Sequence, residues 1–364
     1  MPDAGPCLVF NAGSSSIKAA VFDQHLVQGL TAEASGIGQA GALRIGDHVR
    51  QLGLPDHAAA LDHLMAGLAQ AGLPLSGLGV VAHRVVHGGD ALTAPAAITP
   101  QARAAIADCA ALAPLHNPPA LAVIDHIALA APDLPQTASF DTAFHATIPE
   151  VARRYALPDL PQTAAIKRYG FHGISYAAMV ANWTRATGTP LPRRLLALHL
   201  GNGCSICAIR DGRSVATTMG YSPLEGLTMG TRSGNIDPNA VLRLVDDMGL
   251  EATHDLLNRR AGLLGLSGIS SDMRRLGQSD DPRARFAIDH FCYWAARHAG
   301  SMLVAMGGFD AIAFTGGIGE NDKTVRQRIV ASLAFAGEKP VQVIHAEEER
   351  QIAADAWQVM EPAA

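Results

Sequence analysis

The sequence lacks an excess of positive charge, and it lacks long apolar runs. Its 364 residues contain 28 Lys and Arg against 33 Asp and Glu, and the net charge of −5 leaves no basic stripe to neutralise a nucleic-acid backbone. No apolar run reaches the roughly 18 residues of a membrane helix, and the N-terminus has no basic region followed by an apolar core. We therefore expect a cytoplasmic protein with no nucleic-acid partner, no membrane span and no signal peptide.

Cysteine is scarce, and its five copies are scattered through the chain. An odd number in a chain of this length is typical of reduced intracellular thiols rather than of a disulfide framework. Cys204 and Cys207 form a single CxxC pair in a strand-like run, without a second pair and without a helix start, so we expect buried strand thiols. His83 and His87 lack a helix and a third ligand, which disfavours a zinc site.

The composition provides enough apolar material for two domains. Hydrophobic residues make up 48% of the chain and charged residues 17%, and 364 residues exceed what one core usually supports. Strand-like and helix-like segments alternate, which predicts an α/β fold with helices at 56–71, 100–111, 174–187, 239–247 and 283–306, and strands at 195–200 and 311–314. The prolines of 113–119 predict a loop. The domain boundary is expected between Asp141 and Glu150.

Residues 8–18 place a polar turn, centred on Gly13, between two apolar runs. Glycine permits a positive φ and a close approach to an anion, and Ser14, Ser16 and Lys18 can donate to phosphate oxygens. An ordinary serine-rich turn is the alternative. Residues 199–204 repeat the pattern of strand, small polar turn and strand. The repeat predicts two related lobes, each of which presents one turn to a shared nucleotide.

A third glycine-rich element, at 312–321, follows an apolar run and precedes a helix-compatible segment at 322–335. A loop at a helix N-terminus offers unpaired N–H groups and the positive end of the helix dipole to an anion. The element has neither the Gly-Lys-Ser/Thr end of a P-loop nor a GxGxxG fingerprint. Nucleotide binding of another kind is therefore expected.

Four polar residues are candidates for a functional site because of their sequence context. Arg84 lies between an apolar run and a glycine turn, which suits binding of a carboxylate or phosphate; a salt bridge to a neighbouring lobe is the alternative. Asp141 ends a strand-like run, a frequent place for a catalytic carboxylate, although such a residue can also cap a helix. His172 and Arg232 lie among glycines, either as accessible functional groups or as braces of their loops.

Seven motifs, in chain order, resemble those of acetate kinases over nearly the whole chain. They are Asn-Ala-Gly-Ser-Ser-Ser-x-Lys at 11–18, His-Arg-Val-Val-His-Gly-Gly at 83–89, Phe-Asp-Thr-Ala-Phe-His at 140–145, Arg-Tyr-Gly-Phe-His-Gly at 168–173, His-Leu-Gly-Asn-Gly at 199–203, Met-Gly-Thr-Arg-Ser-Gly at 229–234 and Thr-Gly-Gly-Ile-Gly-Glu-Asn at 315–321. The resemblance implies an α/β fold of two ribonuclease-H-like (actin-like ATPase) lobes with a nucleotide cleft between them. It implies an N-terminal acyl- and phosphate-binding lobe of residues 1–145 plus 349–364, to which the last helix at 349–359 returns. Residues 146–348 would form a C-terminal lobe for nucleotide binding and dimerisation.

The same resemblance implies a reaction. The γ-phosphoryl group of ATP would pass reversibly and directly to acetate, which gives acetyl phosphate and ADP. Mg²⁺ is the implied cofactor, with Mn²⁺ as a possible substitute, and Asn11 and Glu348 are the residues implied near the metal. Glu348 is chosen over Glu347 and Glu349 because the residues that follow it keep the family's spacing. A homodimer is implied as well.

Roles carry over from the family motif by motif. Arg84 would hold the acetate carboxylate, and Asn202 and Arg232 would bind the phosphoryl group. His172 would stabilise its developing charge, and Asp141 would be the essential catalytic carboxylate. Because acetate is already ionised at neutral pH, Asp141 is expected to orient an arginine or a metal-bound water rather than act as a general base. The implied ATP-binding residues are Ser14, Ser16, Lys18, His199, Leu200, Gly201, Asn202, Gly203, Asp272, Met273, Arg274, Gly317, Ile318, Gly319, Glu320 and Asn321.

The implied acyl pocket consists of Val86, Leu115, His116, Phe171 and Pro223. The bulky side chains at these positions favour acetate, and propionate is expected to be a poorer substrate, since one methylene changes binding by roughly 1–3 kcal/mol. A propionate or other short-chain acyl kinase is the alternative within this reaction class. An ATP-gated scaffold or regulator is an alternative of another class, but a pure switch has no need of the acceptor-binding arginines and histidine.

Overall fold

The computed structural model describes residues 5–361. Contacts between residues divide the chain into two units. The first contains the residues up to Phe144, the segment Gly173–Ala178 and the residues from Glu347 on, and the second contains His145–His172 and Met179–Ala346. Neither unit is therefore one continuous stretch of chain. The placement of Gly173–Ala178 in the first unit was not expected from the sequence.

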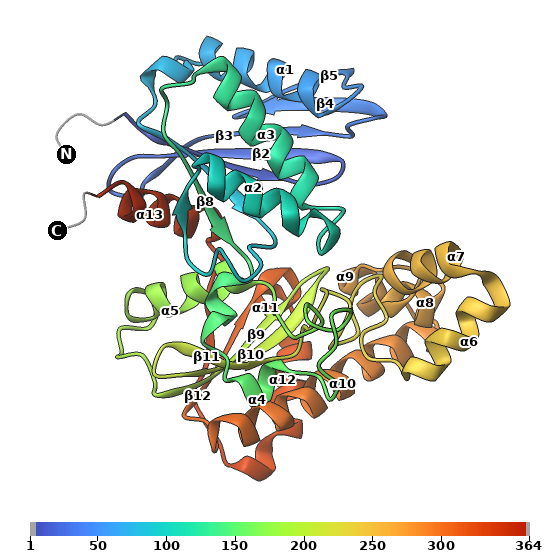
Figure 1. Ribbon diagram of the computed structural model, residues 1–364. Helices are drawn as coiled ribbons and strands as arrows, with labels where there is room; N and C mark the ends of the chain where they lie inside the picture. Colours follow the sequence, from blue (N-terminus) through green and yellow to red (C-terminus); the bar gives the residue numbers. More distant parts are fainter. Residues whose placement is uncertain (1–4, 362–364) are drawn as a thin grey trace. The chain divides into compact units, whose positions relative to one another are not determined.

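The first unit is built on an eight-stranded mixed sheet (Figure 1). In spatial order its strands are β5 (His48–Gly53), β4 (Ala40–Ile45), β3 (Gln28–Ser35), β2 (Ser16–Phe22), β1 (Cys7–Ala12), β6 (Val80–Val85), β8 (Gln136–Phe140) and β7 (Ala96–Ala97). Strands β1 to β5 pair antiparallel in sequence order, whereas β1, β6 and β8 run parallel. Its helices are α1 (His57–Gln70), α2 (Pro100–Asp108), α3 (Asn117–Ala130) and α13 (Glu348–Met360).

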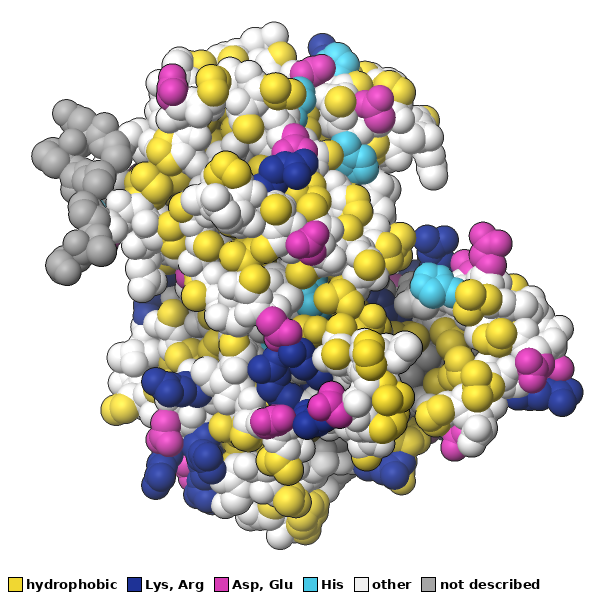
Figure 2. Space-filling view, in the orientation of Figure 1, with side chains coloured by type: hydrophobic (Ala, Val, Ile, Leu, Met, Phe, Trp, Pro, Cys, Tyr) yellow, Lys and Arg dark blue, Asp and Glu magenta, His cyan; other side chains and the backbone are white. Residues whose placement is uncertain are grey.

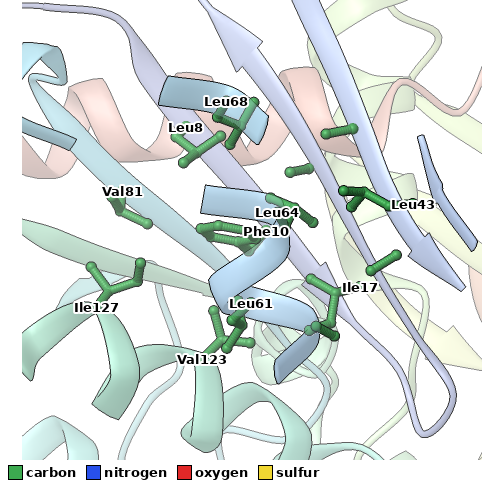
Figure 3. Close-up of a cluster of buried hydrophobic side chains, with 14 of the residues drawn as sticks. Leu8, Phe10, Ile17, Leu43, Leu61, Leu64, Leu68, Val81, Val123 and Ile127 are labelled. Atoms are coloured by element: carbon green, nitrogen blue, oxygen red, sulfur yellow. The ribbon is translucent and has the colours of Figure 1, made fainter. Parts of the chain in front are cut away.

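Alternation of side chains along β1 creates one core on each face of this sheet. Leu8 and Phe10 pack in the cluster formed with α1 and α3, which Figure 3 shows. Cys7 and Val9 pack on the other face, together with Ile352 of α13. Because successive side chains of a strand point to opposite faces, the consecutive apolar residues Cys7 to Phe10 of β1 require cover on both faces of the sheet.

The second unit is built on a five-stranded sheet. In spatial order its strands are β11 (Arg213–Thr217), β10 (Cys204–Arg210), β9 (Arg194–Leu200), β12 (Ala311–Thr315) and β13 (Val341–Val343). Its helices are α4 (Glu150–Arg153), the later part of α5 (Gly173–Thr187), α6 (Pro238–Met248), α7 (Leu250–Asp255), α8 (Gly262–Ser267), α9 (Met273–Gly277), α10 (Pro282–Met306), α11 (Gly316–Asn321) and α12 (Lys323–Ser332). The long helix α10 packs along β10 with a face of mostly small residues.

Both sheets contain the same succession of strands. The order β3–β2–β1–β6–β8 in the first unit matches β11–β10–β9–β12–β13 in the second, and in each the first two pairings are antiparallel and the last two parallel. The β1–β2 turn and the β9–β10 turn occupy equivalent places in this order. The repeated strand–turn–strand seen in the sequence is therefore confirmed as part of a larger duplication.

Two local predictions are wrong. The loop expected at 113–119 ends at His116, because Asn117 begins α3 and the two prolines after it fall in the first turn, where a missing N–H is tolerated. The expected loop within 312–321 is helical, because β12 leads directly into α11. Gly316 makes this change of direction at φ +77°, a conformation that favours glycine.

The cysteine prediction is confirmed. All five cysteines are free and buried, and Cys204 and Cys207 lie in β10. Burial raises the pKa of both thiols to about 12, so they remain protonated. Within residues 5–361, no helix combines the length and the apolar character that crossing a membrane requires.

Candidate active site

Arg84 and Asp141 form a largely buried ion pair in the first unit. Arg84 lies near the end of β6, and Asp141 directly follows β8, the parallel neighbour of β6. Arg84 Nη2 lies 2.7 Å from Asp141 Oδ2, and Arg84 Nε lies 3.4 Å from Asp141 Oδ1. Parallel strands end at the same edge of a sheet, which explains why residues far apart in sequence meet here. The Asp141 carboxylate thus accepts from a guanidinium rather than from the N–H groups of a helix.

Asn11 and Glu348 reach the same guanidinium. Arg84 Nη1 donates to Asn11 Oδ1 at 3.3 Å and lies 3.9 Å from Glu348 Oε2. Burial raises the pKa of Glu348 to about 7; the positive charge of Arg84 opposes this shift and the negative charge of Asp141 adds to it. Arg84 is therefore surrounded by oxygen atoms from three side chains.

Oxygen donors of this kind suit a hard divalent cation. Mg²⁺ at phosphoryl-transfer sites is usually held by one or two carboxylates together with substrate phosphates and water. No group of three His, Cys, Asp or Glu within residues 5–361 has the arrangement of a complete metal site. Asn11 and Glu348 fit a partial site, to which a nucleotide would add the remaining oxygen ligands.

The turn between β1 and β2 is tied to α1. Gly13 N donates to Ser16 O at 2.8 Å, and His57 Nε2 lies 2.8 Å from Gly13 O. The positive φ expected at Gly13 is not found, and a Cβ there would approach no atom more closely than 3.7 Å, so local geometry does not require glycine at this position. Ser14 and Lys18 are exposed and Ser16 is half-buried, which leaves the polar groups of the turn open to a ligand.

The acyl-pocket residues expected in the first unit follow β6 and precede α3. Val86 is almost fully buried, Leu115 is exposed, and His116 is half-buried at the N-cap of α3. Asn117, which the sequence analysis missed, joins the two segments: its side chain donates to His87 O at 3.0 Å and accepts from His87 N at 3.1 Å. The sequence feature that could have drawn attention to Asn117 is its position directly before two prolines.

His172 and Arg232 converge in the second unit. His172 has a left-handed backbone (φ +60°), its Nδ1 lies 2.9 Å from Ser205 Oγ, and its ring stacks on that of His199 with centroids 4.1 Å apart. A Cβ on Gly203 would lie 3.1 Å from His172 Nε2 and 3.4 Å from Arg232 Nη1. Glycine at 203 therefore leaves space in front of an imidazole and a guanidinium. Ser205 was not singled out in the sequence.

Arg232 is a largely buried cation. Nη1 contacts Pro223 O at 3.5 Å and the sulfur of Met229 at 3.9 Å, and no carboxylate within residues 5–361 pairs with it. Burial lowers the pKa of Arg232, in keeping with a guanidinium that has no carboxylate of the described residues beside it. Such a group is suited to bind an anion. Phe171, 2% exposed, and the half-buried Pro223 lie in the same unit.

Asn202 lies at the tip of the β9–β10 turn and is exposed. Gly201 N donates to Gly203 O at 3.0 Å, and Gly230 N donates to Asn202 O at 3.1 Å. A Cβ on Gly230 would lie 2.3 Å from Asn202 Oδ1, closer than real atoms approach. The glycine at 230 thus permits the turn that carries Asn202 to pack on the loop that carries Arg232.

A cavity of about 780 Å³ in the second unit brings together eight of the sixteen expected nucleotide residues. Its lining consists of Gly201, Asn202, Ser271, Asp272, Met273, Arg274, Gly317, Ile318, Asn321, Asp322, Lys323 and Thr324. The last three and Ser271 were not predicted. They belong to the segments that immediately adjoin predicted motifs, so extending each motif by a few residues would have included them.

Five residues of the second unit that were expected to bind the nucleotide are not part of this lining: His199, Leu200, Gly203, Gly319 and Glu320. Ser14, Ser16 and Lys18 belong to the first unit. Leu200 and Gly319 are buried, and Glu320 is used by the protein itself. Glu320 Oε1 accepts from Gly316 N and Ala346 N, each at 3.1 Å, and Oε2 lies 2.7 Å from His345 Nδ1. The Glu320 carboxylate thus holds the start of α11 in place.

The protein belongs to the class of mixed α/β proteins with two actin-like lobes. Each lobe has the five-strand order described above. The chain belongs to the acetokinase family, whose model matches residues 6–354. The chain is similar to the acetate kinase of Rhodopseudomonas palustris, with 42% identity over 348 residues, which cover 91% of this chain and 86% of that protein. The acetate kinase of Deinococcus deserti is 43% identical over 344 residues, with the same shares of 91% and 86%.

Solved structures agree with this assignment. The crystal structure of Porphyromonas gingivalis acetate kinase has a TM-score of 0.91 and 32% identity, and the match covers 98% of this chain and 100% of that one. The structure of a propionate kinase from Francisella tularensis has a TM-score of 0.90 and 34% identity, with 96% and 98% covered. The fold is thus common to relatives named for two different acids.

Proposed function

We propose that this protein transfers the γ-phosphoryl group of ATP to acetate, which gives acetyl phosphate and ADP. An acetate oxygen bonds to the γ-phosphorus while the bond from that phosphorus to the bridging oxygen breaks, so charge balances without a proton transfer. Membership of the acetokinase family supports this reaction. The observation that carries it is Arg232, a largely buried cation that has no carboxylate partner within residues 5–361.

In the first unit, Arg84 binds the acetate carboxylate and Asp141 orients Arg84. The 2.7 Å contact between them supports the role expected for Asp141, since it fixes the direction in which the guanidinium presents its remaining N–H groups. No general base is required, because acetate is ionised at neutral pH. The hydroxyls of Ser14 and Ser16 and the ammonium of Lys18 donate to nucleotide phosphates.

In the second unit, Asn202, His172 and Arg232 bind the phosphoryl group during transfer. A loose phosphoryl-transfer transition state spreads negative charge over its outer oxygens, so positioned donors and cations lower its energy more than a strong base does. The nucleotide occupies the cavity lined by 201–202, 271–274, 317–318 and 321–324. His199, Leu200, Gly203, Gly319 and Glu320 support this site by shaping its backbone.

Asn11 and Glu348 are the residues that would hold Mg²⁺, with Mn²⁺ as a substitute. Bound there, the cation would neutralise phosphate charge. The raised pKa of Glu348, about 7, fits this role, because an added cation would favour the ionised form of the buried carboxylate.

Val86, Leu115, His116, Phe171 and Pro223 provide the acyl pocket, and acetate is the preferred acid. Val86 keeps a branched side chain and is almost fully buried, which limits room for a longer chain. The likeness to a propionate kinase at 34% identity favours keeping propionate as the second candidate substrate.

We also infer a homodimer that resides in the cytoplasm. Helix α6 has no buried residue, and hydrophobic side chains gather on the surface over α6–α8 (Figure 2). Leu242 of α6 is 62% exposed and Leu250 of α7 is 74% exposed, which is typical of a surface that another subunit covers. The five buried free thiols suit a reducing compartment.

The test is an ADP-release assay with Mg-ATP and acetate, propionate, butyrate or no acid, in which hydroxylamine traps any acyl phosphate. Acetate-dependent release with trapped acetyl hydroxamate supports the proposal and ranks the acids. If kcat/KM is higher for propionate than for acetate, propionate is the preferred substrate instead. ATP binding without acid-dependent turnover would favour an ATP-gated scaffold or regulator instead.

A further inference from the structure

We propose that Glu225 is a positioning residue that sets acyl-chain selectivity, because it joins the loop that carries Phe171 and His172 to the loop that carries Pro223 and Arg232. The inference rests on the acyl kinase activity proposed above. All the residues involved belong to the second unit. None of the groups that make this connection is expected to touch substrate.

Arg168 is the first half of the connection. Its Nη2 lies 2.7 Å from Glu225 Oε1, and its Nη1 donates to Met219 O at 3.1 Å and Thr218 O at 3.3 Å. The side chains of Arg168 and Glu225 are only 19% and 30% exposed. One guanidinium thus binds both ends of the 218–225 segment. Because Arg168 lies three residues before Phe171, it holds this segment against the start of the histidine loop.

Tyr155 is the second half. Its hydroxyl donates to Glu225 Oε2 and accepts from Tyr221 N at 3.0 Å. Burial raises the pKa of Tyr155 to about 12, and the hydrogen bond to Glu225 adds to the shift, so the hydroxyl keeps its proton at neutral pH. Both carboxylate oxygens of Glu225 are therefore engaged, each by a different segment of the chain.

The backbone between these side chains is packed without spare room. Tyr169 N and Gly170 N approach Gly220 O at 3.1 and 3.2 Å. A Cβ on Gly220 would lie 1.7 Å from Glu225 Oε2 and 2.1 Å from the Tyr155 hydroxyl oxygen, so only glycine fits over this pair. The two loops behave as one body as long as the Glu225 carboxylate is held by both partners.

This connection has a consequence for selectivity. Pro223 lies two residues before Glu225, and its carbonyl contacts Arg232 Nη1 at 3.5 Å. Loss of the carboxylate would free the Pro223 segment from the Phe171 segment, and a pocket with a mobile wall discriminates less well between acids that differ by one methylene. ATP binding uses other segments of the unit and should change little.

The experiment compares Glu225→Gln and the milder Tyr155→Phe with Asp310→Asn in the full-length protein. Asp310 is a matched control, because it forms a multiply bonded pair with Arg194 in the same unit, at similar exposure, away from both loops. The readouts are kcat/KM for acetate and for propionate, KM for ATP, and hydrogen–deuterium exchange of peptides that cover 168–173 and 218–226.

For Glu225→Gln, we expect the acetate-to-propionate ratio of kcat/KM to fall about tenfold, with faster exchange in both peptides and an ATP KM within about twofold of wild type. Tyr155→Phe should change the acetate-to-propionate ratio and the exchange rates in the same direction but less. If Glu225→Gln does not fold, the result for Tyr155→Phe tests the proposal. Asp310→Asn should leave the ratio unchanged. A wild-type ratio in folded Glu225→Gln would overturn the proposal, whether or not exchange is faster. If the wild type phosphorylates neither acid, the proposed function fails. If hydrogen–deuterium exchange in Glu225→Gln equals that of the wild type, the inference that Glu225 joins the two loops is wrong, whatever the substrate.

Discussion

At the scale of single residues, two arginines hold their charge in opposite surroundings. Arg84 contacts Asp141 and lies 3.9 Å from Glu348, whereas Arg232 has a carbonyl oxygen and a sulfur as its contacts. The first guanidinium is needed to compensate buried negative charge, and the second is itself uncompensated. Removing Arg84 should therefore destabilise the fold, whereas removing Arg232 should not, although both changes should stop turnover.

The paired variants Arg84→Met and Arg232→Met test this contrast. Arg84→Met leaves two carboxylates facing each other and should lower the free energy of unfolding by about 3 kcal/mol. Arg232→Met removes a buried charge and should leave that free energy unchanged or raise it. Urea unfolding followed by circular dichroism measures both, and a comparable loss in the two variants would contradict the contrast.

Asp141→Asn should strongly reduce phosphoryl transfer without preventing nucleotide binding. The amide keeps the shape of the carboxylate but no longer attracts Arg84, so kcat should fall roughly 100- to 1,000-fold. Isothermal titration calorimetry with ATP is expected to give nearly the wild-type Kd, because the nucleotide cavity lies in the other unit. An active Asn variant would remove Asp141 from the mechanism.

Val86→Ala should shift preference towards the longer acid. The smaller side chain leaves more room at an almost fully buried position of the proposed acyl pocket. The kcat/KM for propionate should therefore rise about tenfold relative to that for acetate. Steady-state assays of both acids measure the shift. Leu129→Ala is a suitable control, since Leu129 is 86% exposed on α3.

At the scale of elements, glycines decide how closely the loops approach. Gly230 permits the contact with the Asn202 turn, and Gly203 leaves the space in front of His172 and Arg232. The sequence indicated that glycines flank these residues, but it did not indicate which backbone each glycine faces. That information depends on contacts between segments far apart in the chain.

Gly230→Ala should weaken phosphoryl transfer through Asn202. The added Cβ would lie 2.3 Å from Asn202 Oδ1 and must displace this side chain, so kcat should fall at least about tenfold while the protein stays folded. Gly277→Ala is the control, because a Cβ at Gly277 meets no atom within 4 Å. Equal activity of the two variants would show that the position of Asn202 is unimportant.

Regular elements were largely predictable, because helix periodicity and apolar strands are local signals. The expected helices at 174–187 and 283–306 correspond to α5 and α10, and the expected strand at 195–200 corresponds to β9. Proline and glycine misled the prediction where they occur at the first turn of α3 and within α11. The Arg84–Asp141 pair required the parallel register of β6 and β8, which no local pattern contains.

At the scale of the whole molecule, buried histidines couple folding to pH. Burial lowers the pKa of His83, His87 and His145 to about 4, whereas the unfolded chain binds protons near pH 6.5. Stability is therefore complete above pH 6.5 and is lost as the pH falls towards 4, because the unfolded state then binds the additional protons. Each histidine can contribute up to about 3 kcal/mol to this loss.

Urea unfolding at several pH values between 7.5 and 4.5 should show this loss of stability. His83→Gln removes one of the titrating groups, whose Nε2 lies 2.7 Å from Gln136 Oε1 in the wild type. The variant is expected to be less stable at pH 7.5 but to lose stability less steeply on acidification. An identical slope in variant and wild type would exclude His83 as a contributor.

The passage of the chain between its two units has a consequence for synthesis. The core face of the first unit that contains Cys7 and Val9 also contains Ile352 and Ala356 of α13, which is translated after every strand of the second unit. The second unit, by contrast, has all its strands once Val343 has been added. On the ribosome, the sheet of the unit that is begun first must therefore keep one face uncovered until α13 has been made, after the strands of the second unit are complete.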